Sequence, residues 1–210
     1  MEKKGDKSWS GVIGAHGGYR ELKSYKGAEI IYDATVVFCD RFIEKRSRTH
    51  DQMVQAARSG KQNIAEGSMA SGTSKKTELK LVGVARASLE ELLLDYEDLL
   101  RQRGLKLWEK GHLKAKEVRN RTYRPDKTYG TYKDLVEADA ETAANAMICL
   151  IHQTNYLLDQ QLRQLGKAFL EEGGITEKLY RMRKDRRGVG EHYELGRISF
   201  SLRPCDRLLQ

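Results

Sequence analysis

Apolar residues recur at alternating steps of three and four along much of this chain, which is the spacing of one face of an α-helix. The pattern predicts long helices at about residues 25–45, 49–66, 74–103 and 132–172. In the third, the apolar face is formed by Val82, Ala85, Leu89, Leu92, Tyr96 and Leu99. In the fourth, it is formed by Ala144, Ile148, Ile151, Leu158, Leu162, Leu165 and Phe169. Such faces are typical of helices that pack at shallow crossing angles, so we predict an all-α protein built on an antiparallel, up-down four-helix bundle.

Polar and glycine residues predict where these helices begin and end. Thr49 and Ser74 are the expected N-caps of the second and third helices. Gly67 is expected to end the second helix in the left-handed conformation. Gly104 and Gly173 are expected to end the third and fourth helices.

Several polar residues within the helices have more than one interpretation. Asn155 interrupts the apolar face of the fourth helix. A single buried amide can fix helix register or oligomeric state, but an amide at the edge of the core fits the pattern equally well. Glu66 is expected to pair with Arg58 or Arg86, and Asn63 to bond backbone groups at the end of its helix.

The chain divides into a bundle with one inserted segment and two appended ones. Residues 1–18 are rich in glycine and predict a flexible N-terminal arm. The bundle covers residues 19–174, and a basic insertion at 104–133, between its third and fourth helices, predicts a short helix followed by an irregular connection. Residues 175–210 form a basic C-terminal extension, helical over about residues 176–187. Residues 193–203 alternate in a way that fits either an edge strand or a disordered tail.

The positive charge of the chain is concentrated in the insertion. The formal net charge is +8, and residues 101–133 hold eleven Lys and Arg against Glu109, Glu117 and Asp126. A stripe of this kind favours polyanion binding, although a solvated basic loop explains it equally well. The candidate nucleic-acid contacts are Arg101, Arg103, Lys106, Lys110, Lys114, Lys116, Arg119, Arg121 and Arg124, with Arg181, Arg183, Arg186 and Arg187 in the extension. The rings of Trp108, Tyr123, Tyr129 and Tyr132 are candidates for stacking on bases, and no sequence-reading motif is present.

The sequence carries no recognisable catalytic or metal-binding pattern. No glycine-rich phosphate loop occurs, and the five histidines are far apart. Glu109 and His112 match the Glu-x-x-His spacing of di-iron bundles once, without the second copy that such a site needs. We therefore predict no catalytic residues, metal or cofactor, and a non-enzymatic protein. Three widely spaced cysteines predict a reduced, cytoplasmic protein, and no apolar run is long enough for a membrane span.

Two separated blocks resemble a known family. The first is Asn63-Ile64-Ala65-Glu66-Gly67, and the second runs from Ala85 to Leu92 and includes Arg86 and Ser88. At this spacing they resemble the four-helix-bundle proteins of 23S rRNA intervening sequences, in the longer branch with a C-terminal suffix. This chain departs from the family at residues 60–62, where the family has an apolar residue, proline and serine, and at Ala87, where glycine is usual.

The resemblance implies a bundle that assembles as a ring, typically a homopentamer, with a basic surface and no established enzymatic activity. Relatives of this family include the accessory variability determinant of diversity-generating retroelements, a bundle protein that partners a reverse transcriptase. Two hypotheses follow. The chain is either a nucleic-acid-binding bundle or a protein-interaction scaffold, such as an accessory subunit of a reverse transcriptase.

Overall fold

The computed structural model describes residues 16–194, apart from the side chains of residue 186 and residues 188–194. Over this range helices are the regular elements and no strand occurs, which confirms the predicted all-α class. The α-helices are α1 (Lys23–Phe42), α2 (Arg48–Ala70), α3 (Lys75–Gln102), α4 (Leu113–Thr122), α5 (Lys133–Val136), α6 (Ala140–Glu172) and α7 (Ile175–Glu194). Two short 3-10 helices, η1 (Tyr19–Glu21) and η2 (Tyr129–Thr131), precede α1 and α5.

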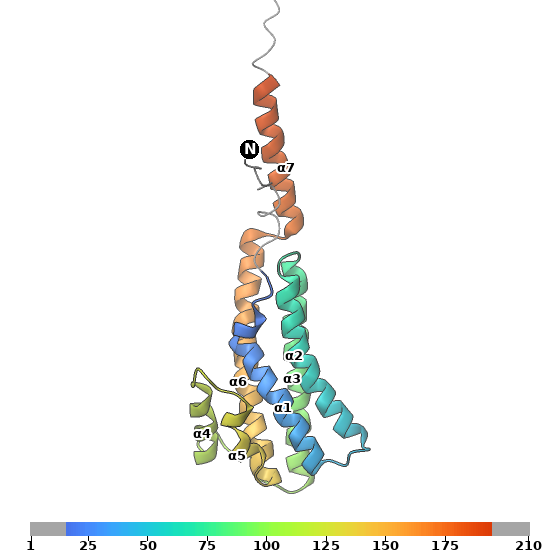
Figure 1. Ribbon diagram of the computed structural model, residues 1–210, viewed down its shortest axis with the longest axis vertical. Coiled ribbons are helices and arrows are strands. Elements are labelled where there is room, and N and C mark those ends of the chain that lie inside the picture. The colour runs from blue at the N-terminus through green and yellow to red at the C-terminus, as the bar shows by residue number, and fades with distance from the viewer. Residues whose placement is uncertain (1–15, 195–210) are drawn as a thin grey trace, which may run out of the picture.

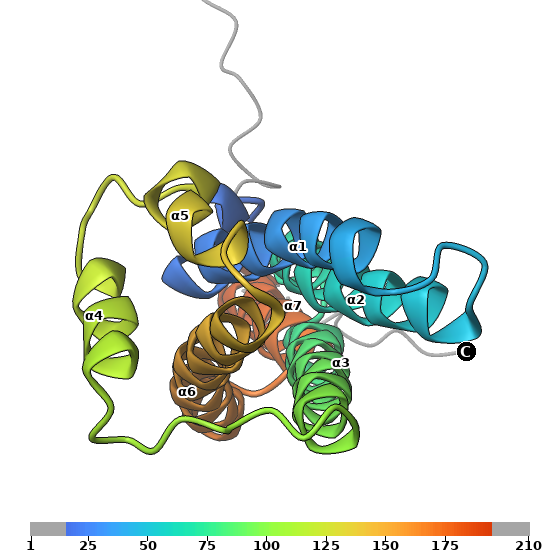
Figure 2. The ribbon, with the colours of Figure 1, turned by 90° about the horizontal axis from the view of Figure 1, so that it is seen from below.

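Four long helices enclose the core. The most extensive packing is between α2 and α3, followed by α3 with α6, and then by α1 with α2 and with α6. Seen end on, these four helices lie around a common centre, while α4 lies outside α6 (Figure 2). Phe38 and Tyr96 meet edge to face in this centre, with ring centroids 4.9 Å apart, and the Tyr96 hydroxyl donates to Thr35 Oγ1 at 3.1 Å. A buried hydroxyl with a partner avoids the cost of an unsatisfied polar group.

The predicted apolar faces are the buried ones. All six apolar positions predicted for the third helix lie in the core. In α6, Ile148, Ile151 and Leu158 are buried, whereas Leu162 and Leu165 are only partly buried. The period of the sequence therefore identified the core side of both helices correctly.

Two predicted boundaries of the second helix are wrong. The N-cap is Ser47 rather than Thr49, because the Ser47 hydroxyl accepts a hydrogen bond from the backbone N–H of His50 at 3.2 Å. Gly67 does not end the helix, which continues to Ala70. Instead, Gly67 lets α3 approach α2 closely, since a Cβ at this position would lie 3.4 Å from the Glu78 carbonyl oxygen.

The predicted start of the fourth long helix is also wrong. A short helix, α5, occupies residues 133–136, and α6 begins only at Ala140. Asp139 is its N-cap, because Oδ1 accepts from the backbone N–H of Thr142 at 2.9 Å and Oδ2 accepts from the Thr142 hydroxyl at 2.8 Å. This cap fixes the start of α6 after the break that follows α5.

The predicted start of α3 and the predicted ends of α3 and α6 agree with the structure, whereas the first helix runs over Lys23–Phe42 rather than about residues 25–45. Ser74 caps α3 by accepting from the backbone N–H of Thr77. Gly104, which follows the C-cap residue Arg103 of α3, and Gly173, which is the C-cap of α6, have positive φ angles of 65° and 73°. These are conformations that glycine adopts without steric cost.

Helix α7 continues past the end of the packed helices (Figure 1). Its presence confirms the predicted helical stretch of the C-terminal extension. Of the arm predicted at residues 1–18, residues 1–15 lie outside the described residues, and Gly17 N–H donates to the Ser68 carbonyl at 3.2 Å. Of the strand or tail predicted at residues 193–203, the first two residues belong to α7 and the rest lie outside the described residues. Between residues 16 and 194, no helix combines the length and the apolar character that crossing a membrane requires.

Candidate nucleic-acid interface

The loop that leads into the basic insertion is fixed to α6 by one buried amide. Asn145 is 1% exposed. Its Nδ2 donates to the carbonyl oxygens of Lys106 at 2.8 Å and Glu141 at 2.9 Å, and its Oδ1 accepts from the backbone N–H of Trp108 at 2.7 Å. A buried amide with all these partners holds the loop in one place.

Helix α4 packs on α6 through a narrow apolar face. Ala115 and Val118 are buried beneath it. The Lys114 ammonium donates to Thr142 Oγ1 at 3.0 Å, and the Thr122 hydroxyl donates to Gln153 Oε1. On the side of α4 away from α6, Leu113, Lys116, Glu117 and Asn120 are exposed.

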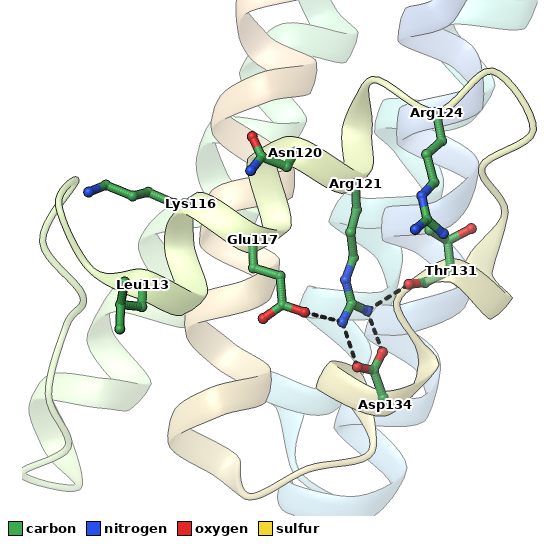
Figure 3. Close-up of a pocket in the computed structure, with 8 residues that line it drawn as sticks. All are labelled: Leu113, Lys116, Glu117, Asn120, Arg121, Arg124, Thr131 and Asp134. Carbon is green, nitrogen blue, oxygen red and sulfur yellow. Dashed lines mark hydrogen bonds and ion pairs between the residues drawn. The ribbon is translucent and has the colours of Figure 1, made fainter.

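Arg121 joins α4 to α5 and is not a free cation. Its guanidinium donates to both carboxylate oxygens of Asp134 at 2.5 and 2.7 Å, to Glu117 Oε1 at 2.5 Å and to the Thr131 carbonyl at 2.8 Å (Figure 3). Only 18% of its side chain is exposed. Hydrogen bonding to Arg121 lowers the pKa of the Asp134 carboxyl, and hydrogen bonding to Asp134 raises the pKa of Arg121. Two carboxylates therefore balance this charge.

Beside this cluster α4 borders an open hollow of about 610 Å3. Its lining is mostly polar and contains three basic residues, two acidic residues and one exposed leucine. The lining residues are Leu113, Lys116, Glu117, Asn120, Arg121, Arg124, Thr131 and Asp134. Lys116 extends away from the Arg121–Asp134 pair (Figure 3). An anion could approach the hollow through the two basic side chains that Asp134 does not engage.

Some of the predicted contact residues already bond to other protein groups, and others do not. Among the predicted contacts between residues 101 and 124, four exposed cations make no side-chain hydrogen bond or ion pair with the described residues, and these are Lys106, Lys110, Lys116 and Arg124. Others donate to protein groups: Arg101 to Asp98 at 2.7 Å, Arg103 to the Phe42 carbonyl at 2.5 Å, and Arg119 to the Lys110 carbonyl at 2.5 Å. The four unengaged cations keep their full capacity to bind an anion.

The basic residues of the extension lie far from this surface. Helix α7 is at one end of the molecule and α4 is near the other (Figure 1). Arg181 donates to the Glu172 carbonyl at 3.3 Å, Arg183 donates to the Leu179 carbonyl at 3.4 Å, and Arg187 is exposed. The side chain of Arg186 is outside the described part. The structure therefore divides the predicted contacts between two separate places.

The four candidate stacking rings also differ in access. Tyr132 is completely buried and its hydroxyl lies 3.2 Å from Thr122 Oγ1, so the prediction that it stacks on bases is wrong. Tyr123 is 85% exposed. Trp108 is half-buried and stacks on His112, with centroids 4.7 Å apart and planes 16° apart. Tyr129 is half-buried. Of the four candidate stacking rings, only Tyr123 is therefore fully accessible.

The residues of the first motif connect α2 to α3. Asn63 Nδ2 donates to the Ser59 carbonyl at 2.9 Å and to Ser59 Oγ at 3.1 Å, and Ser59 Oγ lies 2.9 Å from Ser88 Oγ. Ile64 is buried and Ala65 is partly buried at the same junction. Asn63 bonds one turn back within its own helix, rather than at the end of the helix as predicted.

Arg86 connects α3 to α6. Its guanidinium donates to Glu90 Oε2 at 2.6 Å and to Asp159 Oδ1 at 3.1 Å, and Asn155 Nδ2 donates to the same Glu90 oxygen at 3.1 Å. Glu66 forms no hydrogen bond or ion pair with Arg86 or with Arg58, so the predicted pairing with one of them is wrong. The buried amide of Asn155 lies where the core meets this partly exposed cluster.

The thiols and carboxylates show no reactive arrangement in the part of the chain that the structure describes. Burial raises the pKa of the Cys39 thiol to about 12 and also raises the pKa of Cys149, so both thiols are protonated at neutral pH. Among residues 16–194, no group of three or more His, Cys, Asp or Glu side chains could hold a metal ion. Glu109 and His112 lie exposed in the insertion.

Comparisons with protein-family models, with curated proteins and with solved structures find no match for this chain. The resemblance carried by Asn63–Gly67 and by Arg86 and Ser88 therefore stays a prediction.

Proposed function

We propose that this chain is a non-enzymatic, homo-oligomeric protein with an antiparallel four-helix bundle, and that it binds nucleic acid largely without sequence preference. The observation that carries the proposal is a set of cations that have no side-chain partner and whose backbone is held in place. Lys106, Lys110, Lys116 and Arg124 are exposed, while Asn145 and the Arg121 cluster hold their backbone against α6 and α5. Unpaired cations on a backbone that is already held in place suit phosphate contacts, which act irrespective of sequence.

The connections between helices support the bundle topology. Residues 43–47 link α1 to α2, and residues 71–74 link α2 to α3. Connections this short favour antiparallel neighbours. The longer segment from residue 103 to residue 139 joins α3 to α6, which also pack together, and it carries α4 outside the bundle.

Exposed apolar side chains support self-association. Val84 is 40% exposed and Leu94 is 55% exposed, and both lie on α3 among residues directed away from the core. Large apolar side chains that are left in water on a helix face are a common feature of protein interfaces. The ring of five subunits is an expectation from the family resemblance.

The free thiols fit the proposed cytoplasmic location. Cys39 and Cys149 are both unpaired. Buried thiols of this kind stay reduced in the cytoplasm, where disulfides are rare.

Two variants of equal net charge test the binding surface. Lys116→Glu with Arg124→Glu reverses two charges beside α4. Lys76→Glu with Lys80→Glu reverses two exposed charges at the N-terminal end of α3. We expect the α4 variant to bind oligonucleotides at least tenfold more weakly than wild type at low salt, and the α3 variant to change affinity much less. Equal losses would mean that only the total charge matters, and would contradict a binding surface at α4.

A second candidate function is a protein-interaction scaffold, such as an accessory subunit of a reverse transcriptase. The observation that favours it is α7, which extends beyond the packed helices with Tyr180 64% exposed (Figure 1). Most helical stability in proteins comes from packing of a helix face, so a partner along α7 would stabilise it. Co-purification of the chain with a reverse transcriptase encoded beside it tests this candidate. Loss of the complex after removal of residues 175–210 would support α7 as the contact.

A further inference from the structure

Four side chains form one stripe along α4. His112, Lys116, Arg119 and Tyr123 are spaced by four, three and four residues, so they follow one another along the same side of the helix. The stripe has a ring at each end and two cations between them. At 1.5 Å per residue, its ends are separated by about 16 Å along the helix axis.

The ring at the N-terminal end is already stacked. His112 lies on Trp108 with centroids 4.7 Å apart and planes 16° apart. The Lys114 ammonium lies 5.8 Å from the centroid of the same tryptophan, and the backbone N–H of Trp108 donates to buried Asn145. His112 itself is exposed, so it presents a flat ring on a fixed support.

The other end and the middle of the stripe are accessible as well. Tyr123 is 85% exposed and directly follows α4. Lys116 is exposed and makes no bond to the described residues, and Arg119 is held in place by its hydrogen bond to the Lys110 carbonyl. Rings alternating with cations match a chain in which bases alternate with phosphates.

We propose that the preferred ligand of this surface is single-stranded nucleic acid, with unpaired bases stacked on His112 and Tyr123 and the intervening phosphates bound by Lys116 and Arg119. The inference rests on the proposed nucleic-acid binding and names its substrate class. A duplex cannot use the rings in this way, because its base faces are covered by their neighbours. Phosphate contacts alone would make no such distinction.

Two oligonucleotides with equal phosphate numbers test the proposal. One is a thymidine decamer, and the other is a decamer of the same backbone without bases. We expect the intact decamer to bind about tenfold or more tightly than the abasic one, since each stacked base adds substantially to affinity. In a Trp9→Phe background, where Trp108 is the remaining tryptophan, stacking on His112 should change the tryptophan emission only with the intact decamer.

Matched variants identify the rings. His112→Ala with Tyr123→Ala should bring the affinity ratio of the two decamers close to one while the abasic decamer binds as before. His152→Ala with Tyr156→Ala removes an exposed histidine and an exposed tyrosine from α6 and should leave the ratio unchanged. Equal binding of both decamers by wild type would overturn the stacking inference and leave the proposed phosphate-binding surface intact. Absence of binding to either decamer at low salt would overturn both.

Discussion

The residues that shape the basic surface act through charge pairs and caps, and not through charge alone. Arg121 is a basic residue in a basic segment, yet its guanidinium is bound by Asp134 and Glu117. Asp139 is the N-cap of α6 and accepts a hydrogen bond from the backbone N–H of Thr142. This hydrogen bond is the main cause of the lowered pKa of the Asp139 carboxyl. Arg121 stabilises the folded insertion and Asp139 stabilises the start of α6, so their effects should appear in stability before they appear in binding.

Replacement of Arg121 should destabilise the protein. Arg121→Ala leaves Asp134 and Glu117 without their shared partner and releases α5 from α4. We expect a loss of about 1–3 kcal/mol in the free energy of unfolding, measured by urea denaturation. Arg124→Ala removes a nearby exposed arginine whose side chain makes no hydrogen bond or ion pair with the described residues, and it should change stability by less than about 0.5 kcal/mol. Equal effects of the two variants would mean that the Arg121 cluster contributes nothing.

The lowered pKa of Asp139 predicts a specific pH dependence. A carboxyl whose pKa is lower in the folded state stabilises the fold above its unfolded pKa of about 3.9, and this contribution is lost as the pH falls through the folded value. Asp139→Asn should keep the cap at pH 7, because asparagine is an equally good N-cap, but it should reduce the loss of stability between about pH 4 and pH 2. Asp139→Ala should cost about 1 kcal/mol at pH 7. Urea unfolding across this pH range measures both effects, and parallel pH curves for wild type and Asp139→Asn would contradict the assignment.

At the scale of elements, periodicity predicted the long helices and their buried faces, because burial of an apolar face repeats with the helix turn. Boundaries that depend on tertiary contacts were missed. Gly67 has the residue type of a helix stop, but it lies inside α2, where α3 approaches it. Leu135 and Val136 continue the apolar pattern, so nothing in the pattern revealed the break before Asp139.

The candidate site was predictable only in part for the same reason. Charge counting located the basic segment. Which cations are engaged depends on partners distant in sequence, such as Asp134, thirteen residues from Arg121, and the Phe42 carbonyl, sixty-one residues from Arg103. Asn145 carries no local signal, since an amide inside an alanine-rich helix fits no motif.

Two glycines in the α2–α3 pair should respond in opposite ways to the same substitution. A Cβ at Gly83 would meet nothing within 4 Å, so Gly83→Ala should raise the free energy of unfolding by about 0.5–1 kcal/mol through helix propensity. A Cβ at Gly60 would lie 2.7 Å from Leu89 Cδ2 and 2.8 Å from its Cγ, and Leu89 is fully buried. Gly60→Ala should therefore lower stability by about 1–3 kcal/mol. If both variants were stabilised in thermal or urea unfolding, the contact between Gly60 and Leu89 could not be as close as these distances indicate.

At the scale of the whole molecule, the described part has a packed body with α4 on its side and α7 beyond its end (Figure 1). The basic insertion and the basic extension are therefore separate surfaces, and one bound strand need not touch both. Self-association through the outer face of α3 would multiply the α4 surface, since each subunit brings its own copy. Repeated weak sites on one assembly raise the overall affinity for a long polyanion.

The oligomer prediction depends on the outer face of α3. Leu94→Glu places a charge on this face, where Leu94 is 55% exposed. We expect a lower assembly mass in light scattering with unchanged helix content. Leu107→Glu is the control, because Leu107 is 54% exposed but lies in the insertion. An unchanged mass for Leu94→Glu would place any interface elsewhere.

The salt dependence of oligonucleotide binding tests the proposed phosphate-binding surface at α4 most directly. For wild type, the logarithm of the affinity should fall linearly with the logarithm of the salt concentration, with a slope of several units, because each engaged phosphate contributes about 0.7 for a single strand. Lys116→Glu with Arg124→Glu should reduce this slope, whereas the charge-matched Lys76→Glu with Lys80→Glu should retain it. A wild-type slope near zero, or one that both variants change equally, would contradict a phosphate-binding surface at α4.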